Sequence, residues 1–263
     1  MADVPYEERG VGEAVYLVHA GVFSSWFARL FAEPALDGFR VIRPIRDGYG
    51  GVGPPDEPKS LAAHSRSCAA LLREIGVERV HWVGHSSSCC IGLQLALDDP
   101  TLVASLILFE PAKPWGAVRA AHASSYVGVS MEAAARGDIA AAFDLFMRGV
   151  GGDGYRRPLT ECLGADGVAA AERESAYFFA DELPAVGAWL FGSAEAERIS
   201  APVLLVSGSD SRPWFPDNIA VLAAMLPNAR NVTMPGTDHL APLTDPDLLA
   251  GVIAEHITAL HKP

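Results

Sequence analysis

Residues 81–97 read HWVGHSSSCCIGLQLAL, so three consecutive serines join one apolar stretch to another. The residues before Ser86 are largely apolar and predict a buried strand, whereas the residues from Ser88 onward predict a helix. A hydroxyl buried at this junction without a hydrogen-bond partner would cost about 1–3 kcal/mol. We therefore expect at least one of the three serines to face a cavity.

Short apolar runs alternate with helical patterns along most of the chain. This alternation is typical of an α/β fold, in which helices flank a mostly parallel central sheet. Runs made almost entirely of Val, Ile and Leu further indicate strands that are buried on both faces. The predicted strands are residues 14–21, 39–47, 80–86, 104–111, 202–210 and 229–236, and the predicted helices are at about 61–75, 88–98, 216–226 and 246–260.

Residues 113–198 interrupt this alternation, because they hold helical patterns and no clear strand. An insertion at this place between two strands would lie over the carboxyl edge of the sheet. We therefore expect a core made of residues 1–112 and 199–263, with residues 113–198 inserted as a helical cap or lid. Some cap aromatics could line a substrate pocket, although most should simply pack the cap on the core: Tyr177, Phe178, Phe179, Trp189 and Phe191.

Composition narrows the classes of partner. The chain has 263 residues, of which half are hydrophobic, and its net charge is −12. An acidic surface repels nucleic acid and anionic lipid, so we expect a small-molecule substrate and neither a nucleic-acid nor a membrane partner. Residues 1–10 lack the pattern of a signal peptide, and no apolar run reaches the roughly 18 residues of a membrane span, which favours a cytoplasmic protein. A monomer and a homodimer are both compatible with the sequence.

No cofactor or metal is expected. The four cysteines have no CxxC spacing, and the chain contains no HExxH motif. Residues 48–53 spell G-x-G-x-x-G, a pattern found in dinucleotide sites. However, Pro54 and Pro55 follow at once, where such a site needs the free N–H groups of a helix N-terminus.

Residues 84–88 lie in the strand–turn–helix context in which G-x-S-x-G forms a nucleophile elbow. The strained turn needs small residues two positions before and two after the nucleophile, and here these are Gly84 and Ser88. We therefore predict Ser86 as the nucleophile, Ser87 as a backbone N–H donor to an oxyanion hole, and His85 as part of the pocket floor. The alternative is that these hydroxyls only cap a helix.

A serine nucleophile requires a base and a second oxyanion donor. His239 lies in a loop between the last predicted strand and the C-terminal helix, from which it could reach Ser86 across the carboxyl edge. The loop after the first predicted strand would supply the second donor. The sequence leaves open whether this donor is Gly21 or Val22.

Two carboxylates are candidates for the acid that orients the histidine. Asp210 and Glu110 each end a predicted strand, and Glu110 lies 24 residues after Ser86. A glutamate at the end of a buried apolar strand needs a partner to remain ionised. The position of Glu110 therefore favours a role in the site.

Six motifs follow one another along the chain: VHAG, RDGYG, GHSSS, LILFEP, PVLLVSGSD and PGTDHLAPLTDP. In this order they resemble the α/β-hydrolase superfamily, and the resemblance covers almost the whole chain. It implies an α/β-hydrolase fold and a serine hydrolase with the order nucleophile, acid, histidine. It also implies that Arg46 and Asp47 brace the oxyanion loop.

The resemblance also bears on the acid. It implies an acid three residues after the strand-end Gly208, which here is Ser211, so Asp210 stands one place early. A minority of the superfamily carries the acid at the end of the preceding strand, followed by an irregular segment leading to a tryptophan, here Trp115. We therefore favour Glu110 over Asp210.

These features predict hydrolysis of an ester, lactone or thioester of a small, mainly apolar molecule through an acyl-enzyme. We expect His85, Trp115 and Trp189 to contact the substrate. One alternative is a non-hydrolytic enzyme on the same fold, performing acyl transfer, cyclisation or carbon–carbon cleavage in a biosynthetic pathway. Another is a non-catalytic protein that binds a small ligand.

Overall fold

The computed structural model describes residues 4–118 and 126–261, and in these residues seven strands pair in the order β1-β3-β2-β4-β5-β6-β7. β1 is antiparallel to β3, and every other pair is parallel, as the alternating pattern predicts. The strands are β1 (Tyr6–Arg9), β2 (Ala14–Val18), β3 (Arg40–Pro44), β4 (Val80–His85), β5 (Val103–Phe109), β6 (Val203–Gly208) and β7 (Ala229–Met234).

All six predicted strands are present, and β1 is an additional strand. Its sequence, YEER, has no apolar run, and its side chains are largely exposed at the edge of the sheet. An edge strand buries one side only and can therefore form without a hydrophobic signal.

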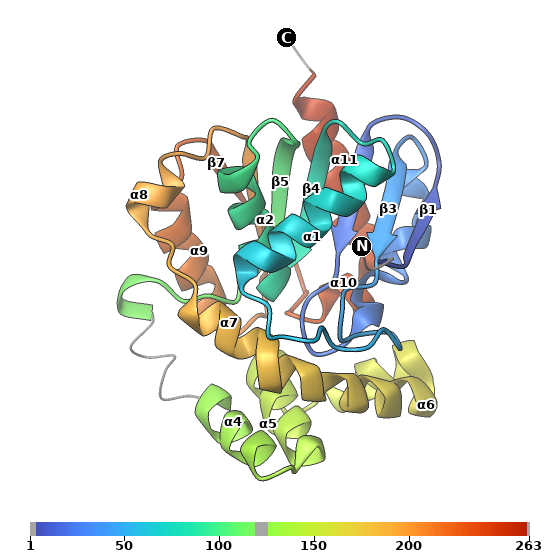
Figure 1. Cartoon of the computed structure of the whole chain (residues 1–263), viewed down its shortest axis with the longest axis vertical. Coiled ribbons are helices and arrows are strands. Elements are labelled where there is room, and N and C mark those ends of the chain that lie inside the picture. The colour runs from blue at the N-terminus through green and yellow to red at the C-terminus, as the bar shows by residue number, and fades with distance from the viewer. Residues whose placement is uncertain (1–3, 119–125, 262–263) are drawn as a thin grey trace.

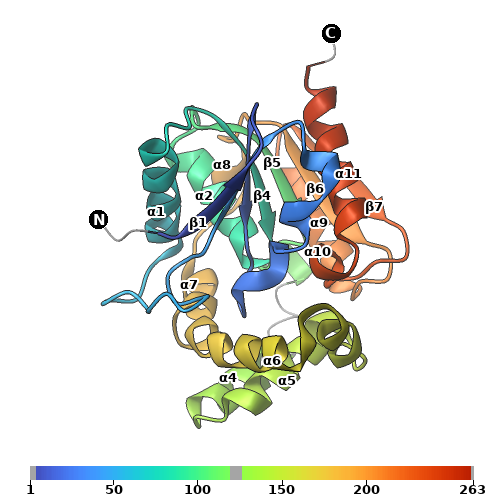
Figure 2. The ribbon, with the colours of Figure 1, turned by 90° about the vertical axis from the view of Figure 1, so that its right-hand side faces the viewer.

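Helices cover both faces of the sheet. α1 (Leu61–Glu74) and α2 (Ser87–Asp98) lie on one face, and α11 (Pro246–Ala259) lies on the other (Figure 2). Alternate side chains of β5 point to opposite faces of the sheet. Leu106 and Leu108 pack with α1 and α2, whereas Ile107 and Phe109 pack with α11. This period of two explains why the central strands read as continuous apolar runs.

The remaining helices of the core are short or lie beside the sheet. Along the chain, three 3₁₀ helices follow β2, α9 follows β6, and α10 follows β7. They are η1 (Ser24–Phe27), η2 (Leu30–Ala32), η3 (Pro34–Leu36), α9 (Trp214–Met225) and α10 (Ala241–Thr244).

The segment between β5 and β6 is helical where the structure describes it. α4 (Tyr126–Ala135), α5 (Ile139–Gly151), α6 (Arg156–Tyr177), the π-helical turn η4 (Phe178–Glu182) and α7 (Leu183–Ala188) lie together beyond one end of the sheet (Figure 1). We call α4 to α7 the cap helices. α8 (Ser193–Ala196) instead packs beside α2 in the main core. Residues 119–125 of the predicted cap lie outside the described residues, and its boundaries at 113 and 198 stay a prediction.

The cap helices join the core through a hydrophobic cluster of their own. This cluster combines side chains of α5 and η4 with Val22, Trp26 and Phe215 from the loops and helix beyond the strand ends. The cap therefore covers the carboxyl edge of the sheet, where the predicted site residues end their strands. Among the described helices, none is both long and apolar enough to cross a membrane.

Candidate active site

Ser86 occupies a sharp turn between the end of β4 and the start of α2. Its backbone has φ 55° and ψ −114°, a conformation that residues with a side chain rarely adopt. The turn is held by its backbone: Ser86 N–H donates to Phe109 O at 2.9 Å, and Ser86 O accepts from Cys89 N–H at 3.2 Å. A Cβ at Gly84 would lie 2.9 Å from the Cys89 nitrogen, so this position requires glycine.

The three serines differ in what their side chains contact. Ser86 is half-buried and lines a cavity. The Ser87 hydroxyl accepts a hydrogen bond from Gly21 N–H at 2.8 Å. The Ser88 hydroxyl accepts from His85 N–H at 2.8 Å and lies 2.6 Å from Val18 O, to which it donates. Ser88 thus ties the turn to β2 through hydrogen bonds, in addition to the steric role predicted for it.

The cavity at Ser86 is small and lies between the sheet edge and the cap helices. Its volume is about 30 Å³, and apart from Ser86 and Ser87 its wall is apolar or aromatic. The cap helices and α9 supply most of this wall, including Tyr126, Phe146, Phe178, Val186 and Phe215. The space next to Ser86 is therefore narrow and its surroundings are apolar.

His239 is brought to Glu110. Its Nδ1 lies 2.7 Å from Glu110 Oε2, and both side chains are buried. The other carboxylate oxygen, Oε1, accepts the Gly208 N–H at 2.9 Å and the Ser211 hydroxyl. With Nδ1 engaged, Nε2 is the nitrogen of His239 that can take a proton.

Asp210 lies elsewhere. Its side chain is exposed and accepts a hydrogen bond from Ser209 Oγ at 2.8 Å. Ser211, at the position where the superfamily's acid is usual, donates to Glu110 instead. Of the two candidate carboxylates, the structure therefore brings Glu110 and not Asp210 to the histidine.

The imidazole of His239 is fixed by its neighbours. It stacks on Phe215, with ring centroids 4.3 Å apart and an interplanar angle of 15°. The ring of His85, the residue directly before Ser86, lies 4.5 Å from it. His239 therefore lies beside the Ser86 turn, although 153 residues separate the two in sequence.

The contacts of the oxyanion loop favour Val22 over Gly21 as the second donor. Gly21 N–H already donates to Ser87 Oγ. Val22 has φ 73°, in a tight turn closed by a hydrogen bond from Phe23 N–H to Gly21 O. Within the described residues the Val22 N–H has no acceptor. Ser87 is the first residue of α2, where backbone N–H groups have no partner inside the helix. Val22 and Ser87 are therefore the candidate donors.

Backbone strain is concentrated here. In the described part of the chain, the non-glycine residues with positive φ are Val22, Ser86 and Glu110. They come from three different strand ends and meet at one edge of the sheet. Each such conformation costs of order 1–3 kcal/mol and persists where the surrounding structure imposes it, typically at functional sites.

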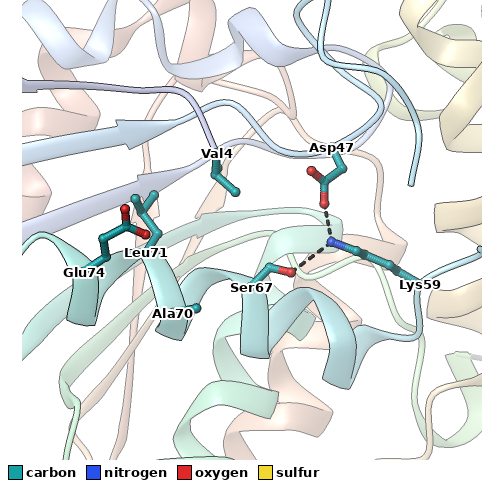
Figure 3. A pocket seen from close by; sticks show the side chains of 7 residues that line it. All are labelled: Val4, Asp47, Lys59, Ser67, Ala70, Leu71 and Glu74. Atoms are coloured by element: carbon teal, nitrogen blue, oxygen red, sulfur yellow. Dashed lines mark hydrogen bonds and ion pairs between the residues drawn. The ribbon is translucent and has the colours of Figure 1, made fainter. Parts of the chain in front are cut away.

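Arg46 and Asp47, both predicted to brace the oxyanion loop, make different contacts in the structure. Arg46 N–H donates to His19 Nε2 at 3.2 Å, and His19 Nδ1 bonds Ala20 O at 2.7 Å, so the Arg46 backbone does brace the oxyanion loop. Asp47 instead forms an ion pair with Lys59, and both residues line a separate cavity of about 190 Å³ beside α1 (Figure 3). This ion pair is with Lys59 and not with the oxyanion loop, so the bracing role of Asp47 stays a prediction.

The residues that the sequence predicts to contact substrate do not line the Ser86 cavity. Trp115 Nε1 donates to Phe191 O at 3.1 Å, and Trp189 Nε1 donates to Gln94 Oε1 at 2.7 Å. Both indoles pack in the main core and neither lines the Ser86 cavity. His85 is fully buried beneath the turn. The chain after β5 places Trp115 against Phe191 and Asn218 of α9, and the chain after α7 places Trp189 against Gln94 of α2, which keeps both indoles away from Ser86.

No metal centre is found in the described residues: within them, no three His, Cys, Asp or Glu side chains converge as a metal ion would require.

Comparisons with known proteins agree with this architecture. A model of the alpha/beta hydrolase family matches residues 15–252. The chain is similar to the putative carbamate hydrolase RutD of Klebsiella pneumoniae (strain 342), with 26% identity over 254 residues, which cover 95% of this chain and 93% of that protein.

Other similarities are partial or structural. The chain is 31% identical over 127 residues to the dihydrolipoyllysine-residue acetyltransferase component of the acetoin cleaving system of Cupriavidus necator. That match covers 47% of this chain and 33% of the relative, so it spans about a third of the relative's length. The enol-lactonase from Burkholderia xenovorans LB400 superposes with a TM-score of 0.75 at 20% identity, covering 97% of this chain and 96% of that one. This last likeness concerns the fold.

Proposed function

Since this chain belongs to the alpha/beta hydrolase family, we propose that it is a serine hydrolase that cleaves an ester, lactone or thioester of a small, mainly apolar molecule. One observation carries the proposal. The Glu110–His239 hydrogen bond of 2.7 Å lies beside the strained turn that presents Ser86 to a cavity. This is the combination of nucleophile, base and orienting acid that acyl transfer needs.

The geometry supports the following reaction. Ser86 Oγ attacks the carbonyl carbon while His239 Nε2 takes its proton, and the N–H groups of Val22 and Ser87 bind the oxyanion. The tetrahedral intermediate expels the leaving group, which receives the proton from His239. Water then attacks the acyl-enzyme with the same histidine as base, and the carboxylic acid leaves. Glu110 keeps the imidazole in the correct tautomer and stabilises its positive charge.

The wall of the cavity supports a small apolar acyl group over a charged one, because none of the residues that line it is charged. A carbamate carbonyl would be attacked in the same way, and the Klebsiella relative is named a putative carbamate hydrolase. Carbamates therefore belong in a substrate panel beside esters, lactones and thioesters.

Covalent labelling tests the proposal. We expect a fluorophosphonate to add once to the protein and peptide mapping to place the adduct on Ser86. A short-chain p-nitrophenyl ester should give a burst of p-nitrophenolate close to one equivalent of enzyme if deacylation limits turnover. A folded protein that takes up no fluorophosphonate and hydrolyses no member of the panel would contradict a serine hydrolase and favour a ligand-binding protein.

The pH dependence follows from burial of the Glu110–His239 pair. Burial raises the pKa of Glu110 to about 7, although hydrogen bonds from Ser211 and Gly208 act to lower it. Burial lowers the pKa of His239 to about 3, so the imidazole is neutral at neutral pH. Below pH 7 the pair keeps the proton on Glu110, and a neutral carboxyl cannot stabilise an imidazolium.

We therefore expect kcat/KM to rise with an apparent pKa near 7 and then to stay level as the pH increases further. In Glu110→Gln this limb should vanish, which leaves the residual activity flat between about pH 5 and 8. Full pH profiles of both proteins measure this. The same limb near 7 in the variant would assign the titration to another group.

A further inference from the structure

We infer that Glu182, contributed by the cap, positions the oxyanion hole through the hydroxyl of Ser87. The hole is then complete only while the cap is docked on the sheet. This inference rests on the proposed function, because it assigns a second task to the same site. Glu182 does not contact the reacting atoms and is a positioning residue.

Glu182 is anchored in the core by a buried ion pair. Its side chain is fully buried, and Arg46 binds it with two contacts, Nη1 to Oε2 at 3.0 Å and Nη2 to Oε1 at 3.1 Å. The Tyr49 hydroxyl donates to Oε2 as well. Arg46 and Tyr49 belong to the loop after β3, so the pair connects the sheet edge to the π-helical turn of the cap.

The carboxylate is ionised. Burial acts to raise the pKa of Glu182, but the charge of Arg46, together with the smaller effects of His64 and of hydrogen bonding, outweighs burial and holds that pKa at about 2. Because Arg46 balances the charge, Glu182 can accept hydrogen bonds beside the oxyanion hole without adding a net negative charge there.

Ser87 connects this carboxylate to the loop that carries the other donor. The Ser87 hydroxyl accepts from Gly21 N–H at 2.8 Å. Glu182 lies against the same glycine, since a Cβ at Gly21 would lie 3.2 Å from its Oε1, and Ser87 is one of the groups that lower the pKa of Glu182. Gly21 directly precedes Val22, whose N–H is one candidate donor, and the N–H of Ser87 is the other. One cap carboxylate thereby fixes the relative position of both donors.

The cap lies against the oxyanion loop along one helix face. A Cβ at Gly21 would lie 2.3 Å from Phe178 Cδ2 and 3.2 Å from Glu182 Oε1. A second cap carboxylate, Glu174, accepts the Ser24 N–H at 2.7 Å. Glu174, Phe178 and Glu182 are spaced four residues apart, which places them on the same side of the helix. The loop is therefore held by the cap at both ends.

A double-mutant cycle tests whether Glu182 acts through Ser87. Ser87→Ala keeps the backbone donor and removes only the hydroxyl, and Glu182→Gln keeps the side-chain shape and removes the charge. Each is expected to lower kcat about 10- to 100-fold with KM changed by less than about threefold, because the oxyanion exists only in the transition state. The double variant should be no slower than the slower single variant. Additive losses would overturn the inference.

Glu174→Gln is the matched control. It is the same substitution on the same helix face, but its partner is Ser24. Its effect should add to that of Ser87→Ala, since the two side chains share no hydrogen bond. Coupling of equal size in this control would mean that Ser87 senses the cap in general and not Glu182, which contradicts the inference.

Two further outcomes are separated by design. Glu182→Gln can unfold the protein, because it leaves Arg46 buried without its counter-charge. In that case Ser87→Ala decides alone, and a wild-type kcat in Ser87→Ala overturns the inference. Fluorophosphonate labelling of the wild-type protein reports on the proposed function separately. A labelled, active wild type without Ser87–Glu182 coupling refutes this inference only, whereas an unlabelled wild type refutes the serine hydrolase.

Discussion

Ser86→Ala is expected to lower kcat/KM about 10⁵- to 10⁶-fold and to abolish fluorophosphonate labelling. The substitution removes the atom that forms the acyl-enzyme, so His239 and the oxyanion hole are left with water as the attacking group. The fold should survive, because backbone groups of Ser86 hold the turn. The melting temperature should therefore change little while the activity disappears.

Initial rates with the best ester of the panel, together with intact-mass spectrometry after labelling, measure this effect. Ser209→Ala is a suitable control, since Ser209 is an exposed serine near the same edge of the sheet. We expect it to retain activity within about twofold, as most surface substitutions do. Persistent labelling of Ser86→Ala would place the nucleophile at another residue.

Glu110→Gln is expected to lower kcat about 10⁴-fold, and Asp210→Asn about twofold or less. Glutamine is nearly isosteric but neutral, so it neither stabilises the imidazolium nor fixes the tautomer of His239. Asp210 is exposed and hydrogen-bonded to Ser209, so its charge is screened by solvent. Steady-state kinetics of both variants with one substrate compare the two carboxylates directly.

A relocated carboxylate sharpens this comparison. Ser211 Oγ already reaches Oε1 of Glu110, so Glu110→Ala combined with Ser211→Asp should recover at least about tenfold over Glu110→Ala alone. Equal losses in Glu110→Gln and Asp210→Asn would contradict the assignment and mean that the two carboxylates act together. Failure of the Ser211→Asp rescue alone would restrict the acid to the end of β5.

Much of the fold could be predicted because its signals are local. Continuous apolar runs identified the six strands from β2 to β7, and the strand–turn–helix pattern located the Ser86 turn. β1 was missed because an exposed edge strand needs no apolar run. The substrate-contacting role of Trp115 and Trp189 was misplaced, because an aromatic residue in an irregular segment carries no signal of which side it packs against.

The sequence by itself determined the parallel sheet, the strained serine turn and the two possible acids, since each depends on neighbouring residues or on where a strand ends. Only the tertiary structure decided that Glu110 reaches His239, that Ser87 occupies the N–H of Gly21, and that Glu182 pairs with Arg46. The members of these pairs lie 129, 66 and 136 residues apart. Hydrogen bonds over such separations depend on side-chain direction and cap docking, which leave no periodic pattern along the chain.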